Sequence, residues 1–369
     1  MPNKITEYGD GNWNWRTTSP FSQAIEIGDQ IFISGQQALT EGGELVAPND
    51  IAGQTRCVFE NMKAVLERAG LDLSALVRLN TYYVFDGADE DATEYWEAMT
   101  RVRLEYFPDP GPAATAVRIK GMPYQGQLIQ IEGIALRGAA RRNRKRLMPG
   151  GSWDWSIAVP LSQGWEVGDR IYVGGQISAD EKGVSVHVGD LSAQTRAIYT
   201  FIEAVLKEGG GSFDDIAHLK LCVKHNSTEA DGTSFLDRIL DVTKEYVGEN
   251  GPVVTCFCVD LLYPGLDLEI DAMAFKSNHQ RMTLGPAGSK VHDGYFPDSI
   301  RASDEIWVGG QVAQSDAGEV MAPGDIREQA RIVFQRLRDV LALSDASLDD
   351  IVKMNLFFTA SGEDVKEEL

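Results

Sequence analysis

The sequence has no long apolar run. None of its segments approaches the roughly 18 uninterrupted apolar residues that a membrane-spanning helix needs. The N-terminal segment, MPNKITEYGDGNWNW, also lacks the apolar centre of a secretory signal. We therefore expect neither a membrane partner nor export from the cell.

Cysteine and histidine are scarce, and neither has an informative spacing. The four cysteines are Cys57, Cys222, Cys256 and Cys258. Without a disulfide framework they suit a reducing compartment and predict a cytoplasmic protein. The five histidines are His187, His218, His225, His279 and His292. They show no metal-ligand spacing, so we predict no metal and no other cofactor.

Positive charge is also in short supply. The 369 residues include 34 Lys and Arg against 55 Asp and Glu, a net charge of −21. Phosphate backbones are bound by clustered Lys and Arg, so this balance argues against a nucleic-acid partner and leaves a small molecule as the expected ligand. One basic run, residues 141–146, is expected to be a solvated linker.

One motif occurs three times in the chain. It reads IFISGQ at residues 31–36, IYVGGQ at 171–176 and IWVGGQ at 306–311, with offsets of 140 and 135 residues. Such a long period is one whole small domain. The predicted units span residues 1–138, 153–277 and 294–369, joined by linkers at 139–152 and 278–293.

The first copy predicts the order β-β-α-β-α-β-β. Strands are expected at residues 21–27, 30–36, 76–85, 114–120 and 127–136, with a helix after Asp50 and another before Pro108. Apolar residues follow one face of each helix. We therefore expect an α+β unit with helices on one face of a mixed sheet.

The second copy repeats this pattern position by position, whereas the third covers only its first half. The third copy keeps the hairpin, the capping Asp325, a helix and a strand at 351–360. The sequence given ends before the remaining elements. Three explanations stay open: a piece of a longer chain, completion by another subunit, or a half-sized unit.

Four segments carry a resemblance to a known family. They are Pro20–Ala24 (PFSQA), Ile33–Gln36 (ISGQ), Asp50–Arg56 (DIAGQTR) and Ile131–Ala135 (IEGIA). Together they resemble the reactive intermediate deaminase family, also called Rid, YjgF or L-PSP. Copies one and two match over their full length and copy three over its first half.

The resemblance implies a chorismate-mutase-like α+β fold that usually forms homotrimers. Members hold ligands in clefts between neighbouring units and hydrolyse reactive imines or enamines, releasing ammonia. Three fused copies then imply an intrachain pseudo-trimer. A further homo-oligomer that completes the third unit is also expected.

The chain departs from the family at the cation that holds the substrate carboxylate. The family pattern there is Pro-x-Arg-Ser/Thr, but this chain has Ala114 in copy one and Val254 in copy two. Neither side chain can form a bidentate carboxylate clamp. We therefore expect a neutral or aromatic substrate instead of the usual 2-imino acid.

Copy two has the stronger candidates for catalysis. The family's glutamate on the last strand corresponds to Gln130 in copy one and to Glu269 in copy two. A carboxylate can place or deprotonate water, and an amide cannot. Cys256 is expected to line the same pocket or to attack the substrate, with a small core residue as the alternative.

Glycines and aromatic residues are the candidate ligand contacts. The glycines resemble the family position where backbone approaches ligand, with a tight strand crossing as the alternative. The aromatic residues would wall a cleft, with core packing or cover of a sheet edge as the alternative. The candidates are Gly35, Gly175, Gly310, Phe21, Trp13, Trp15, Trp153 and Trp155.

Two functions from different classes remain open. The first is a hydrolase or deaminase acting on a small C–N compound. The second is a non-catalytic protein that binds a metabolite or serves as a structural partner. A Gln-x-Arg sequence follows each motif, at Gln54, Gln194 and Gln329, and is expected to form hydrogen bonds between units.

Overall fold

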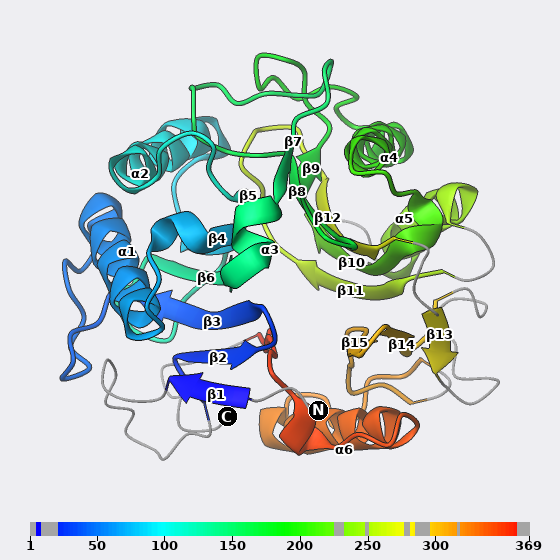
Figure 1. The fold of residues 1–369 in the computed structure, drawn as a ribbon. Helices are drawn as coiled ribbons and strands as arrows, with labels where there is room; N and C mark the ends of the chain where they lie inside the picture. Colours follow the sequence, from blue (N-terminus) through cyan, green and yellow to red (C-terminus); the bar gives the residue numbers. More distant parts are fainter. Residues whose placement is uncertain are drawn as a thin grey trace.

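The computed structural model describes residues 5–8, 21–224, 232–247, 251–276, 281–284, 296–315 and 318–359. Its strands form two six-stranded mixed sheets and one three-stranded sheet. Figure 1 shows the three sheets around a common centre, with the long helices on the outside. The α+β class and the repeated units predicted from the sequence are confirmed.

The first unit has the predicted element order, preceded by an additional strand. Its elements are β1 (Ile5–Tyr8), β2 (Ala24–Ile27), β3 (Gln30–Gln37), α1 (Ile51–Arg68), β4 (Leu76–Val84), α2 (Ala92–Tyr106), β5 (Ala113–Ile119) and β6 (Ile129–Leu136). The strand order is β1-β2-β3-β6-β4-β5. Strand β5 pairs in parallel with β4 and is an outer strand of this sheet.

The second unit repeats the first. Its elements are β7 (Lys145–Leu147), β8 (Gly164–Val167), β9 (Arg170–Ile177), α4 (Leu191–Glu208), β10 (Ile216–Val223), α5 (Gly232–Tyr246), β11 (Val253–Cys258) and β12 (Leu268–Phe275). The strand order is β11-β10-β12-β9-β8-β7. Short 3-10 helices precede β4, α2 and β10, at Leu73–Ala75, Asp89–Asp91 and Phe213–Asp215.

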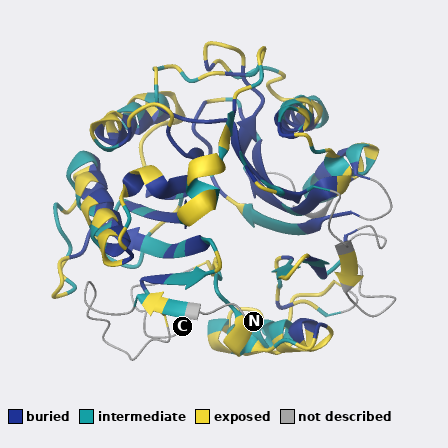
Figure 2. Ribbon diagram, viewed as in Figure 1, coloured by how far each residue is buried: buried dark blue, intermediate teal, exposed yellow. Residues whose placement is uncertain are grey.

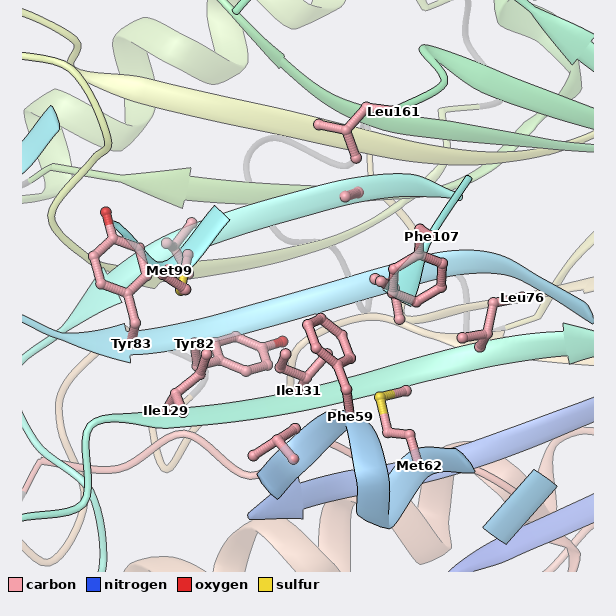
Figure 3. Close-up of a cluster of buried hydrophobic side chains, with 14 of the residues drawn as sticks. Phe59, Met62, Leu76, Tyr82, Tyr83, Met99, Phe107, Ile129, Ile131 and Leu161 are labelled. Atoms are coloured by element: carbon pink, nitrogen blue, oxygen red, sulfur yellow. The ribbon is translucent and has the colours of Figure 1, made fainter. Parts of the chain in front are cut away.

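Helix α1 illustrates why the sequence folds this way. The Asp50 side chain accepts a hydrogen bond from the backbone N–H of Gly53 and begins the helix. The apolar stripe that includes Phe59 and Met62 is fully buried against the sheet, as the dark blue inner faces in Figure 2 show. Each large buried side chain of this kind stabilises the fold by about 1.5–3 kcal/mol. Figure 3 shows part of this core.

The basic run is not the solvated linker that we expected. Residues Gly138–Asn143 form helix α3, and β7 follows directly. The Arg144 guanidinium lies 4.4 Å from the ring centre of Trp165 in the second unit and donates to the Leu76 carbonyl in the first. Arg146 donates to Ser162 and pairs with Asp109. These arginines therefore connect the first two units.

The third unit is described only in part. Its elements are β13 (Arg281–Leu284), β14 (Ser299–Ala302), β15 (Glu305–Val308), α6 (Ile326–Ala342) and a 3-10 helix (Leu348–Asp350). The strand predicted at 351–360 does not form over the described residues 351–359. In the other units the corresponding strand pairs with the two strands that follow it. The given sequence contains no counterparts of those strands for the third unit.

Each pair of units is in contact. Arg78 of the first unit forms a buried ion pair with Asp271 of the second, at 2.5 Å. Lys353 of the third unit pairs with Glu132 of the first, at 2.6 Å. The backbone N–H of Gly310 in the third unit donates to the Val254 carbonyl in the second. In the described part of the chain, no helix is long and apolar enough to cross a membrane.

Candidate functional site

The first and second units meet where β5 approaches β9. A Cβ atom added to Gly174 would lie 3.2 Å from the Ala114 carbonyl oxygen. A Cβ atom on Gly111 would lie only 1.5 Å from the Pro160 carbonyl oxygen. Glycine therefore permits a close backbone approach at this boundary, and it brings Ala114, the residue at the family's arginine position, against the second unit.

Glu269 lies at the same boundary. Its side chain lies above Gly175, where an added Cβ atom would be 1.8 Å from the carboxyl Oε1. The backbone N–H of Ala116 in the first unit donates a hydrogen bond to this carboxylate. Burial and the nearby Asp271 raise the pKa of Glu269 to about 8. A group that titrates near neutral pH suits proton transfer.

The corresponding position in the first unit cannot titrate. Gln130 lies above Gly35, 2.2 Å from an added Cβ atom, and accepts a hydrogen bond from Gln37. Gly35 and Gly175 thus make room for a neighbouring side chain of their own unit. Gly310 differs, because an added Cβ atom there would lie 3.3 Å from Thr255 of the second unit.

A small cavity lies beside β5, between the helices and the sheet of the first unit. Its volume of about 20 Å³ is space for one or two water molecules. Trp155 and Leu161 of the second unit close one side. It is lined by Thr55, Phe59, Thr81, Trp96, Met99, Thr100, Arg103, Ala114, Ala116, Ile131, Trp155 and Leu161. Ala116 connects the cavity to Glu269, because its side chain lines the cavity and its N–H binds the carboxylate.

Arg103 of α2 is the charged group of this lining. Only 8% of the residue is exposed, and its Nε and Nη2 atoms have no hydrogen-bond partner within the described residues. Its guanidinium carbon lies 5.7 Å from the ring centre of Phe107. Burial lowers the pKa of Arg103 to about 9, so the side chain is still charged at neutral pH. Buried charges are normally paired, so an unpaired one needs a reason.

The sequence reasoning did not identify Arg103. The available signal was a basic residue beside the apolar stripe of the second predicted helix. The offset of 140 residues aligns it with Thr243 in the second unit. Comparison of the two copies at buried helix positions could therefore have identified this arginine.

The predicted aromatic contacts have different surroundings. Trp155 lines the cavity and stacks on Trp96, with ring centres 4.9 Å apart. Trp153 is buried, and its indole N–H donates to the Gln176 side chain. Phe21 is 60% exposed. Trp13 and Trp15 lie outside the described residues.

Cys256 does not share the boundary at which Glu269 lies. It belongs to β11, whose neighbouring residue Val254 contacts Gly309 and Gly310 of the third unit. Burial raises the pKa of Cys256 to about 12, so the group stays a thiol at neutral pH. The described contacts thus place Cys256 and Glu269 beside different units, and a protonated thiol is a weak nucleophile.

The Gln-x-Arg sequences also differ from expectation, because they act within units. The Gln54 side chain donates to the carbonyls of Ala47 and Gly126 and accepts from the N–H of Leu128. Gln194 makes the corresponding bonds in the second unit. These glutamines anchor loops instead of joining neighbours.

The histidines form no metal site in the part that the structure describes. No group of three His, Cys, Asp or Glu side chains there could hold a metal ion. His218 bonds Thr255 at 2.9 Å and stacks on Trp307 of the third unit. Burial lowers the pKa of His218 to about 4, so this ring is neutral. His225, His279 and His292 lie outside the described residues.

Comparisons with known proteins agree with the repeated fold. The family model described as Endoribonuclease L-PSP matches residues 14–137, 155–276 and 289–367. A RutC family protein of Pyrococcus abyssi is 39% identical over 119 residues, which is 32% of this chain and 87% of that protein. A 2-iminobutanoate/2-iminopropanoate deaminase of Dermatophagoides farinae is 29% identical over 117 residues, 32% of this chain and 85% of that protein.

Among solved structures, a chorismatase has a similar fold. It is 16% identical, with a TM-score of 0.50, over 68% of this chain and 77% of that protein. At this identity the likeness concerns the fold alone. It extends over more than one unit, since a single unit is about a third of the chain.

Proposed function

Because the chain belongs to the Endoribonuclease L-PSP family, we propose that it hydrolyses a small C–N compound, an imine, an enamine or an aminated heterocycle, and releases ammonia. We place the reaction between the first and second units. Glu269 is the proposed catalytic residue, and the cavity beside β5 is the proposed ligand site. A relative named as an imine deaminase supports this class of reaction.

The observation that carries the proposal is the state of Glu269. A buried carboxyl group with a pKa of about 8 is partly ionised at neutral pH. The ionised form takes a proton from water as the water oxygen bonds to the imine carbon. That proton passes to the imine nitrogen and gives a carbinolamine. Glu269 then moves the proton of the carbinolamine hydroxyl to the nitrogen, the C=O bond forms as the C–N bond breaks, and ammonia leaves with the electron pair of the C–N bond. The products are a carbonyl compound and ammonia, so one water molecule is consumed.

The chain offers one such acid at the boundaries between described units. Gln130 replaces it in the first unit, and an amide cannot remove a proton from water at neutral pH. Asp271 and Glu132 are acidic, but both are held in ion pairs with Arg78 and Lys353. Two further acids at these boundaries, Glu305 and Asp260, are likewise held by Arg170 and Arg118. Glu269 is therefore the acid available for proton transfer.

Ammonia release over a panel of imines, enamines and aminated heterocycles tests the proposal. The change Glu269→Gln should lower the rate by about 10²- to 10⁴-fold, which is the usual contribution of a general base. Cys256→Ser is the matched control and should leave the rate close to that of the parent. Equal rates for the parent and Glu269→Gln would place the chemistry elsewhere.

A second candidate function is binding without catalysis. Two observations favour it: the Glu269 carboxylate already accepts the Ala116 N–H, and the cavity holds only one or two waters. A parent protein that binds ligands but releases no ammonia from any compound of the panel would support this alternative.

We also propose that the three units form an intrachain pseudo-trimer. The contact between Lys353 and Glu132, which connects the third unit back to the first, supports this arrangement. A homo-oligomer that completes the third unit and a cytoplasmic location are further proposals. Analytical ultracentrifugation of the parent protein distinguishes a monomer from a larger assembly.

A further inference from the structure

We propose that Arg103 is an anion-binding residue and that the substrate carries a carboxylate, which this guanidinium holds inside the cavity. The inference rests on the proposed function, since it concerns the ligand of the same site. It reverses the expectation of a neutral substrate that followed from Ala114 and Val254. The cation comes from helix α2 instead of from the strand.

The second unit shows the same packing with a different pair of side chains at these positions. The positions of Phe59 and Arg103 are taken there by Tyr199 and Thr243. The Tyr199 hydroxyl and the Thr243 hydroxyl form a buried hydrogen bond of 2.8 Å. In that unit, two neighbouring side chains satisfy one another's polar groups.

At two other positions of the cavity lining, the first unit again has the more polar side chain. Thr81 and Thr100 of the first unit correspond to Leu221 and Leu240 of the second. The first unit thus has two hydroxyl groups where the second has leucine side chains. It has a cation where the second has Thr243, which is hydrogen-bonded to Tyr199. Three polar replacements around one cavity indicate space for a polar ligand group.

The charge of the lining selects an anion. Of the described residues that line the cavity, Arg103 alone carries a formal charge. A guanidinium presents its N–H groups as a fork that matches the two oxygens of a carboxylate. Small side chains at Ala114 and Ala116 leave this cavity open beside β5.

The rest of the ligand has to lie toward Trp155. This side chain and Leu161 belong to a segment of the second unit without regular secondary structure before β8. Such a segment moves more easily than the helix or the sheet. Trp155 is stacked on Trp96. A flat or aromatic part of the ligand could stack on one of these rings in place of the other ring. The inferred ligand class is a small carboxylic acid with an unsaturated or aromatic body.

Binding of benzoate tests the inference without any catalysis. Isothermal titration calorimetry compares benzoate with benzamide, its neutral counterpart, on the full chain at neutral pH. We expect benzoate to bind at least tenfold more tightly than benzamide. Arg103→Met should lower the benzoate affinity at least tenfold. The control Arg101→Met, on the same helix but with a 63% exposed side chain, should leave the affinity unchanged.

Thermal unfolding of the same variants separates binding from a structural role. Methionine keeps much of the volume and removes an unpaired buried charge, so Arg103→Met should melt at the same or a higher temperature than the parent. A lower melting temperature with unchanged benzoate affinity would assign Arg103 a structural role. If Arg103→Met does not fold, Arg103→Lys provides the comparison, with weaker benzoate binding expected from its point charge.

The outcomes distinguish this inference from the proposed function. Glu269→Gln should bind benzoate as the parent does while releasing ammonia about 10²- to 10⁴-fold more slowly. Benzoate binding that depends on Arg103, in a parent without deaminase activity, would support the anion site and contradict the hydrolase. Failure of the parent to bind benzoate, phenylacetate or pyruvate would overturn the anion site, as would unchanged benzoate affinity in a folded Arg103→Met protein.

Discussion

The first two units have the same fold, but they differ at one buried pair. Tyr199 and Thr243 satisfy each other's hydroxyl groups in the second unit. Phe59 and Arg103, at the corresponding positions of the first, leave a guanidinium without a partner among the described residues beside a small cavity. The two units therefore keep the same helix-on-sheet packing but differ in the polar groups of its interior.

At a second pair of corresponding positions, the second unit carries the ionisable side chain and the first unit does not. The second unit has Glu269 above Gly175, whereas the first has Gln130 above Gly35. The acid therefore comes from the second unit and the cation from the first. Ala116 of β5 connects their surroundings, because it lines the cavity beside Arg103 and its N–H binds the Glu269 carboxylate. A fused chain can combine them at one boundary, whereas three identical subunits would carry the same residues at every boundary.

The largest expected effect concerns the ion pairs that hold the units together. Asp271 contacts Arg78 at 2.5 Å and Lys220 at 2.8 Å, and all three side chains are less than 10% exposed. Asp271→Ala would leave two buried cations unpaired and should cost about 3–5 kcal/mol of unfolding free energy. Urea unfolding measures this loss.

Glu132→Ala, the corresponding change in the first unit, is the comparison. It should cost less, because its partner Lys353 is 23% exposed and can turn toward water. Equal losses for the two acids would show that exposure does not govern these contacts.

Introducing an arginine at Thr243, the position in the second unit that corresponds to Arg103, tests whether the two units differ in their tolerance of a buried charge. Thr243→Arg places a cation in the second unit, where Leu221 and Leu240 offer no polar group and Tyr199 loses its partner. We expect a loss of about 3 kcal/mol, the lower end for an uncompensated buried charge. Arg103→Met in the first unit should cost nothing. Comparable losses for both changes would mean that Arg103 has an unrecognised structural partner.

Local features of this fold could be read from the sequence, and distant ones could not. The cap at Asp50 and the stripe through Phe59 were predicted because they depend on neighbours three or four residues apart. The missing partner of Arg103 depends on two helices, three strands and Trp155 of another unit, which no single segment encodes. The strand predicted at 351–360 does not form over residues 351–359 for a similar reason, since such a strand needs partner strands for its hydrogen bonds and its own residues do not show whether these are present.

Two residues of the candidate site, the acid Glu269 and the lining residue Trp155, were predicted from the sequence. Glu269 was found because copy alignment shows a carboxylate where the first unit has Gln130. The placement of Glu269 and Cys256 beside different units depends on how the strands pair and how the units meet, and the sequence motif does not contain that information. The basic run at 141–146 was wrongly predicted to be a solvated linker, because the same arginine sequence is compatible with solvation and with stacking on a distant residue such as Trp165.

The stability of the protein should also depend on pH through Glu269. Its folded-state pKa of about 8 exceeds the ordinary value of 4.5, so the folded protein keeps a proton that the unfolded chain has lost. Relative to Glu269→Gln, the parent should lose stability as pH rises from about 4.5 to 8, by at most about 1.4 kcal/mol per pH unit. Above pH 8 the difference should stay constant.

Chemical unfolding of both proteins at several pH values measures this difference. Gln130→Glu is the matched variant, because it introduces a titrating group at the corresponding position of the first unit. A difference between the parent and Glu269→Gln that does not change with pH would contradict a raised pKa at Glu269.

The smallest loss of stability is expected for an exposed ion pair that both units have. Arg56 pairs with Glu105, and Arg196 pairs with Glu245, each at 2.6 Å on the exposed surface. Exposed pairs are screened by water and salt and contribute little. Arg56→Ala and Arg196→Ala should therefore shift the melting temperature by small and equal amounts. A clear difference between them would reveal divergence beyond the buried positions.

The most direct test of the account is a crystal structure of the chain grown with benzoate. Its central claim is that the boundary between the first and second units, with Arg103 on one side, is the ligand site. The account predicts a benzoate carboxylate within hydrogen-bond distance of the Arg103 guanidinium, with its ring near Trp155, and no benzoate beside Thr243. Benzoate bound elsewhere, with Arg103 left untouched, would contradict it.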